Sequence, residues 1–182
     1  TSRCLALDGS TLPVQGPPGT GKSHTGALTI LALLRAGKTV GITAVSHKVI
    51  LNLVTKVRDL AKAQGVDLPL FHTKKLDTLP QGVAFADTKS PPVPGGVLSG
   101  VAWTWASKAR IDDANKVDYL FVDEAGQMAL PTVLAASRGA RNLILLGDPM
   151  QLEQPRRGAH PDGADQAALV HLLEKDQQVL RP

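Results

Sequence analysis

The chain of 182 residues has one cysteine, 3% aromatic residues and no long hydrophobic run. A lone Cys4 cannot form an internal disulfide, and no Cys/His cluster has zinc spacing, which fits a reducing compartment and no structural metal. The longest apolar stretch, residues 27–34 interrupted by Thr29, is far below the ~20 residues needed to cross a bilayer. Since no signal pattern precedes that stretch, we expect a soluble, cytoplasmic protein without membrane contact.

The overall composition is typical of one folded domain. With 43% hydrophobic and 20% charged residues, the chain is neither disordered nor fibrous. Residues 1–91 hold 11 Lys+Arg and 5 Asp+Glu, whereas residues 92–182 hold 9 and 11, and the basic first half permits a polyanionic partner. Because the chain opens on Thr1 and stops at Pro182 without a recognisable terminus, we expect residues 1–182 to be a single domain of a larger protein.

Apolar runs rich in Val, Ile and Leu alternate with helical patterns, which is typical of βα units in a parallel sheet buried on both faces. The expected strands are 11–15, 39–44, 68–72, 96–102, 117–123 and 142–147. A buried helix is expected over 22–35 and an amphipathic one over 47–64, with Lys48, Lys56, Arg58 and Lys62 on its solvated face. Turn residues dominate segment 74–96, which predicts a loop insertion.

The strongest local signal is the phosphate-loop pattern GxxxxGK[ST], which stands between an expected strand and an expected helix. It is formed by Gly16, Pro17, Pro18, Gly19, Thr20, Gly21, Lys22 and Ser23. Its glycines let successive backbone N–H groups turn toward a β-phosphate, to which the helix N-terminus adds partial positive charge. Lys22 is the expected point charge for the β- and γ-phosphates, and the Ser23 hydroxyl the expected Mg²⁺ ligand.

Two further buried strands end in polar residues. Strand 117–123 runs into Asp123 and Glu124, and strand 142–147 runs into the loop that holds Gln151. Ligands of open α/β sheets lie at the carboxyl ends of the strands, so these side chains should meet the phosphate loop in one crevice. There Asp123 can hold Mg²⁺, Glu124 can polarise an attacking water, and Gln151 can reach a γ-phosphate.

Four segments in order, QGPPGTGKS, ITAVSHKVILNL, VDEAGQM and GDPMQLEQP, resemble motifs I, Ia, II and III of superfamily 1 helicases. The chain is similar to the branch that includes the nonsense-mediated-decay helicase and DNA replication helicases, and in particular to bacterial helicase regions joined to a RecB-like nuclease. This resemblance covers residues 12–155. It implies a P-loop NTPase fold, a RecA-like α/β parallel sheet with helices on both faces. Motifs IV to VI, which in the family belong to a second RecA-like domain, are absent from the chain.

The resemblance implies a motor that hydrolyses ATP to move along single-stranded nucleic acid, DNA rather than RNA, together with that second domain. It implies that residues 19–23 bind ATP phosphates and Mg²⁺, Asp123 holds Mg²⁺, Glu124 activates water, Gln151 senses the γ-phosphate and Gln127 couples hydrolysis to the following segment. The candidate contacts to nucleic acid are Ser46, His47, Asn52 and Thr104. His47 could equally cap the following helix, and Asn52 could face solvent.

Some alternatives remain open at this stage. Trp103 and Trp105 could stack bases, although packing is the commoner role of tryptophan. A P-loop kinase would need an acceptor pocket and an Arg-rich lid, neither of which is evident in the sequence. A nucleic-acid-binding module that uses nucleotide only as a structural or regulatory ligand would not need the complete set of catalytic residue types described above.

Overall fold

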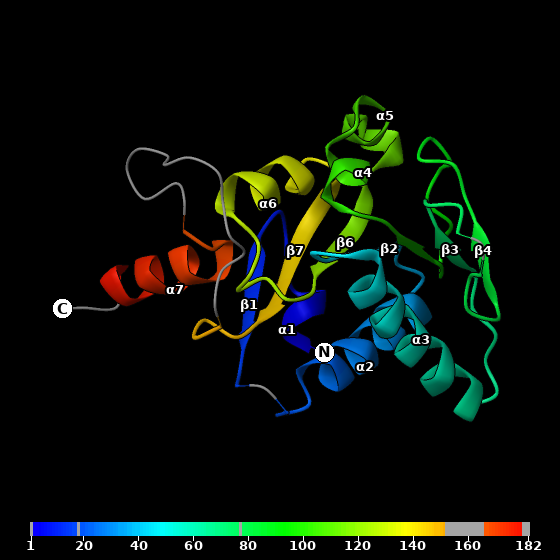
Figure 1. Cartoon of the computed structure of the whole chain (residues 1–182), viewed down its shortest axis with the longest axis horizontal. Coiled ribbons are helices and arrows are strands. Elements are labelled where there is room, and N and C mark those ends of the chain that lie inside the picture. The colour runs from blue at the N-terminus through cyan, green and yellow to red at the C-terminus, as the bar shows by residue number, and fades with distance from the viewer. Residues whose placement is uncertain (1, 18, 77, 152–165, 180–182) are drawn as a thin grey trace.

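The computed structural model describes residues 2–17, 19–76, 78–151 and 166–179. Its centre is a seven-stranded sheet in the order β1-β7-β6-β2-β5-β3-β4, in which every pair of neighbours is parallel (Figure 1). The strands are β1 (Thr11–Gln15), β2 (Val40–Thr43), β3 (Leu70–His72), β4 (Val83–Phe85), β5 (Val97–Ser99), β6 (Val117–Val122) and β7 (Ala140–Gly147). The predicted parallel α/β sheet is confirmed.

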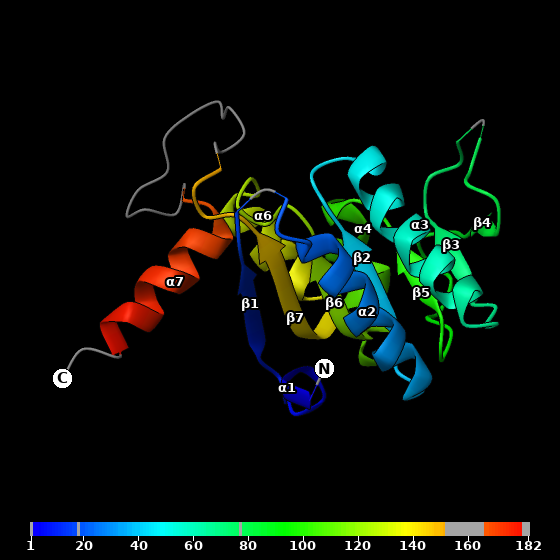
Figure 2. The same cartoon turned by 90° about the horizontal axis from the view of Figure 1, so that it is seen from below.

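Helices cover both faces of this sheet, as Figure 2 shows from below. One face carries α2 (Lys22–Arg35) and α3 (His47–Ala63), and the other carries α4 (Ala102–Ala106), α6 (Leu130–Ser137) and the start of α7 (Ala168–Val179). The remaining helices are short: α1 (Ser2–Leu5), α5 (Lys108–Ile111) and a 3-10 turn over Asp113–Asn115. In the part of the chain that the structure describes, no helix is both long and apolar enough to cross a membrane.

The central strand β6 shows why the sequence forms such a sheet. Tyr119 and Phe121 pack into the core under α2 and α3, whereas Leu120 and Val122 pack into the core on the opposite face. All four side chains are at most 3% exposed. Burying one large apolar side chain contributes about 1.5–3 kcal/mol, so a strand that is apolar on both faces is stable only between two helical layers.

The structure differs from the sequence prediction at the far edge of the sheet. Segment 74–96, predicted as a loop insertion, contains β4, which pairs with β3 over the whole of Leu70–His72. A strand of three residues among prolines and glycines is too short to show a period in the sequence. The strand expected over 96–102 ends at Ser99, because the chain turns into α4 at Ala102.

Candidate functional site

The phosphate loop lies at the carboxyl edge of the sheet, between β1 and α2. The Gly16 N–H donates to the Gly147 carbonyl at the end of β7 (3.2 Å). Gly19 and Gly21 have φ angles of +79° and +80°, a left-handed conformation that residues with a Cβ adopt only at a cost. At Gly16 the constraint is space, since a Cβ there would lie 2.8 Å from the Thr20 hydroxyl oxygen. The geometry therefore accounts for each glycine of the pattern.

The polar groups of the loop converge on one point. The Lys22 ammonium and the Thr20 hydroxyl both donate to the carbonyl of Pro17, each at 2.7 Å. Helix α2 begins at Lys22 without a side-chain N-cap, so its first-turn N–H groups remain available to an anion. Ser23 follows in that first turn, and Pro18 lies outside the described residues.

The carboxylate pair stands where β6 ends. Asp123 is 6% exposed, and its Oδ1 accepts the backbone N–H of Glu124 (3.0 Å). Burial raises the pKa of Asp123 to about 6, with a smaller contribution from the Glu124 charge, while the Glu124 N–H, Lys56 and Lys22 act in the opposite sense. Such a carboxyl group favours a bound cation, which would compensate its buried negative charge.

The chain turns sharply at Glu124, shortly after the end of β6. Glu124 has a φ of +54°, and it is the one non-glycine residue in the described ranges with a positive φ. Backbone strain of this kind costs about 1–3 kcal/mol and persists where the surroundings impose it. Here the next N–H, of Ala125, donates to the Leu146 carbonyl of β7 (2.9 Å), and the Gln127 N–H donates back to the Glu124 carbonyl (2.8 Å).

The turns after β6 and β7 touch each other through their backbones. A Cβ on Gly126 would lie 2.1 Å from the carbonyl oxygen of Asp148, so only glycine fits at that position. Asp148 is itself 5% exposed and accepts the backbone N–H of Met150 (2.9 Å). Sequence reasoning missed Gly126, although the glycine between the carboxylate pair and Gln127 was the available signal. This contact links the loop that carries Gln151 to the carboxylate pair.

A cavity of about 360 Å³ joins the three motifs. Its lining residues are Gly19, Gly21, Lys22, Ser23, His24, Lys56, Asp123, Glu124 and Gln151. The structure thus brings together the side chains that the sequence placed at the ends of three separate strands. Within the described residues the Gln151 Oε1 is buried without a hydrogen-bond partner, so it can accept from a donor bound in the cavity.

Lys56 is a residue whose place the sequence did not predict. The helical period put it on the solvated face of α3, and its side chain is exposed, yet it lines the cavity and its charge lowers the pKa of Asp123. Lys48 and Lys62, on the same helix, do not line this cavity. Only the packing of α3 beside α2 distinguishes the three lysines, and that packing is not visible in the sequence.

None of the candidate nucleic-acid residues lines this cavity. Ser46 is the N-cap of α3, since its hydroxyl accepts the Val49 N–H (3.3 Å), and Asn52 is exposed on the same helix. Thr104 is 5% exposed and its hydroxyl pairs with that of Thr73 (3.0 Å). Packing in α4 therefore leaves the Thr104 hydroxyl little exposed surface, and its contact with a strand stays a prediction.

The two tryptophans have different environments. Trp105 is fully buried, its indole N–H donates to the Gly100 carbonyl (3.2 Å), and its ring lies where a Cβ on Gly41 would be. Packing, the commoner role, is confirmed for Trp105. Trp103 is 80% exposed, so its ring is available for stacking.

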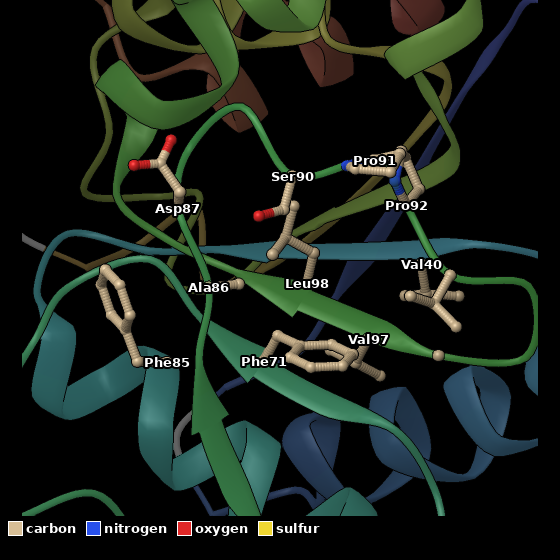
Figure 3. Close-up of a pocket in the computed structure, with 12 residues that line it drawn as sticks. Val40, Phe71, Phe85, Ala86, Asp87, Ser90, Pro91, Pro92, Val97 and Leu98 are labelled. Atoms are coloured by element: carbon tan, nitrogen blue, oxygen red, sulfur yellow. The ribbon is translucent and has the colours of Figure 1, made fainter.

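A second pocket, of about 220 Å³, lies beside β3, β4 and β5 (Figure 3). Phe71, Phe85 and Val97 form apolar walls, and Pro91 and Pro92 lie on its far side. It shares no residue with the 360 Å³ cavity. Its lining residues include the acidic Asp87 and no Lys or Arg, which makes it unsuited to phosphate.

Comparison with known proteins gives a family model described as an AAA domain, which matches residues 3–174. Among curated proteins, the chain is 28% identical over 145 residues to the DNA replication ATP-dependent helicase/nuclease DNA2 of Saccharomyces cerevisiae, covering 76% of this chain and 10% of that protein. It is 28% identical over 160 residues to the protein of the same name from Schizosaccharomyces pombe, covering 82% and 11%. The chain thus spans about a tenth of the length of these relatives.

Among solved structures, the chain resembles the Arterivirus nonstructural protein 10 helicase with a TM-score of 0.52 and 21% identity. The likeness covers 89% of this chain and 33% of that one. At this identity the comparison supports the fold: a parallel α/β sheet shared by the two chains.

Proposed function

The chain belongs to the AAA domain family, and from this membership we propose that it is the ATP-hydrolysing motor domain of a helicase that moves along single-stranded nucleic acid. The observation that carries the proposal is the cavity in which Lys22, Asp123 and Glu124 meet. The names of both curated relatives, which describe ATP-dependent helicases, support the motor function.

The donor set of the cavity fits Mg²⁺. The Ser23 hydroxyl and the buried Asp123 carboxylate are oxygen ligands of the kind that Mg²⁺ prefers. Among the described residues no group of three His, Cys, Asp or Glu side chains could enclose a metal, which suits an ion completed by phosphate oxygens and water. When bound, Mg²⁺ neutralises charge on the β- and γ-phosphates.

Different residues of the chain have different roles in the proposed hydrolysis. Lys22 and the N–H groups at the start of α2 bind the β- and γ-phosphates. Glu124 orients a water molecule toward the γ-phosphate and accepts its proton, so that ATP and water become ADP and phosphate. Gln151, which lines the same cavity, senses the γ-phosphate, and Gln127 couples that change to the segment beyond it.

The motor domain is also proposed to act with partners. We propose that a second RecA-like domain in the same protein completes the ATP site, that the strand is DNA, and that a RecB-like nuclease domain accompanies the motor. The names of the two yeast relatives, which describe DNA replication helicase/nucleases, support the choice of DNA and the presence of a nuclease. On this chain, Ser46, His47, Asn52 and the exposed Trp103 are the proposed strand contacts. Fast, strand-stimulated turnover by these 182 residues alone would contradict the need for a second domain.

The experiment that tests the nucleotide site is Lys22→Met, which removes the ammonium and keeps an unbranched side chain. We expect it to weaken ATP binding about ten- to a hundredfold, because hydrogen bonds to charged phosphate oxygens are lost from a partly enclosed site. Titration calorimetry with ATP and Mg²⁺ measures the affinity. Lys62→Met, an equal change at an exposed position outside the cavity, is the control and should leave it unchanged. Unaltered affinity in Lys22→Met would refute the site.

Lys56→Gln should weaken the same binding by a smaller factor, about two- to fivefold, because an exposed charge is screened by water. The loss should shrink as salt is raised, which separates a charge effect from a packing effect. Lys62→Gln serves as the matched variant on the same helix. A loss in Lys56→Gln that is independent of salt would show that Lys56 does not act through its charge.

A further inference from the structure

Three hydrogen-bonded side chains form a row that runs from the first residue of α3 into the sheet. The His47 Nδ1 lies 3.0 Å from the His72 Nε2, and the His72 Nδ1 lies 2.8 Å from the Ser99 hydroxyl oxygen. The Ser99 hydroxyl lies 2.9 Å from the Phe71 carbonyl oxygen. The rings of the two histidines meet edge to face, with centroids 5.1 Å apart. His72 and Ser99 are fully buried, so water does not compete for these bonds.

The chemistry of the row determines which atom donates at each step. A carbonyl can only accept, so the single proton of the Ser99 hydroxyl goes to Phe71. The Ser99 oxygen is then the acceptor for His72, whose Nδ1 must carry a proton. The backbone of Ser99 also hydrogen-bonds the His72 ring and stabilises its charged form, which agrees with a proton on that side of the ring.

His72 carries no second proton at neutral pH. Burial lowers its pKa to about 4, with further lowering by His47 and Lys74 that outweighs the opposite effect of the Ser99 backbone. The His72 Nε2 is therefore unprotonated and can only accept, so the His47 Nδ1 must donate to it. Burial, followed by the charge of Lys74, also lowers the pKa of His47, so its ring carries one proton at pH 7.5. Because Nδ1 donates to His72, that proton lies on Nδ1 and the His47 Nε2 is unprotonated.

His47 is half-buried, and its Nε2 takes no part in the row. Within the described residues this nitrogen has no hydrogen-bond partner, and it is not one of the buried polar atoms left unpaired. His47 follows the N-cap Ser46 at the start of α3, among the proposed strand contacts. Phosphate oxygens are acceptors, and two acceptors cannot pair.

We infer that His47, held in one tautomer by His72, presents Nε2 as a hydrogen-bond acceptor that takes an N–H of a base or an O–H of a sugar from the bound strand, and does not contact phosphate. The inference rests on the proposed function, because it needs a strand on this surface. His47 is the contact residue, and His72 and Ser99 are positioning residues that act through it.

The tautomer is tested without nucleic acid. Nitrogen-15 NMR of the histidine side chains at pH 7.5 should show both His47 and His72 protonated at Nδ1 and bare at Nε2. A proton on the His47 Nε2 would overturn the inference, because that atom would then be a donor suited to phosphate. This measurement uses the unaltered protein and does not depend on whether it binds a strand.

The contact is tested with three short single strands: adenine DNA, adenine RNA, and a DNA strand of tetrahydrofuran spacers that has neither bases nor sugar hydroxyls. Two variants are compared, His47→Gln, which keeps an amide near the position of Nε2, and His47→Asn, which keeps one near Nδ1 only. His47→Asn should weaken binding to a strand that offers the donor about three- to tenfold, whereas the spacer strand should bind as before. His47→Gln should recover most of the loss.

The pattern across strands identifies the donor. Equal losses with adenine DNA and RNA indicate a base N–H, and a loss with RNA alone indicates the ribose hydroxyl. A loss of the same size with the spacer strand would overturn the inference, since only phosphates remain there to be contacted. Failure of the unaltered protein to bind any strand would overturn the proposed function, whereas the NMR result on the tautomer would stand.

Discussion

Glu124→Gln is expected to slow ATP hydrolysis about 10²–10⁴-fold, the range that general-base catalysis supplies, while ATP still binds. Glutamine has the size and shape of glutamate, so the cavity and the left-handed turn at this position are retained. Its amide can hold a water molecule but cannot take the proton from it at neutral pH. The variant should therefore accumulate bound ATP instead of ADP.

The rate of the chemical step is measured as phosphate release in a single turnover with no acceptor other than water. The affinity for ATP is measured by calorimetry. Glu174→Gln, at an exposed position of α7, is the matched control and should hydrolyse ATP at the normal rate. If Glu124→Gln lost binding as severely as Lys22→Met, the division between a phosphate-binding lysine and a water-activating glutamate would be wrong. Phosphate transfer that required an added acceptor would instead favour a kinase.

Local patterns were enough to predict the elements that position the nucleotide cavity. Strand β6 is apolar on both faces and β1 precedes a glycine-rich turn, so the sheet and the phosphate loop could be placed from residue order alone. The meeting of Lys22, Asp123 and Gln151 followed from one rule, that parallel strands deliver their carboxyl ends to one edge.

The features that the sequence did not predict depend on contacts between distant segments. His47 and His72 are 25 residues apart, and they pair because α3 begins beside the strands that carry His72 and Ser99. The approach of Gly126 to the Asp148 carbonyl is likewise set by the packing of two turns. Neither contact leaves a periodic pattern or a fixed residue spacing in the sequence. Thr104 shows the converse. The strand predicted to reach residue 102 ends at Ser99, so the chain enters α4 at Ala102 and the Thr104 hydroxyl lies in a side chain that is only 5% exposed.

In the metal-free protein, Asp123→Asn should raise the free energy of unfolding by about 3 kcal/mol at pH 7.5. The carboxyl pKa is raised from the usual 3.8 to about 6 in the folded state, and each pKa unit corresponds to about 1.4 kcal/mol. The stability that this group contributes is complete below pH 3.8 and is lost as the pH rises through 6. Above pH 6 the folded protein therefore carries the full cost of a buried charge, which asparagine removes.

Urea unfolding in the presence of EDTA at pH 7.5 and pH 4 tests the sign of this effect, because the advantage of Asp123→Asn should largely vanish at pH 4. Asp67→Asn, at an exposed position, should show no such pH dependence. A variant that is less stable than the unaltered protein at pH 7.5 would contradict the assigned burial cost. Adding Mg²⁺ with ATP should reverse the order at pH 7.5, since a ligand that binds only the folded state stabilises it and the carboxylate is the group that holds the cation. The instability of the empty site is thus the expected counterpart of its affinity for the metal nucleotide.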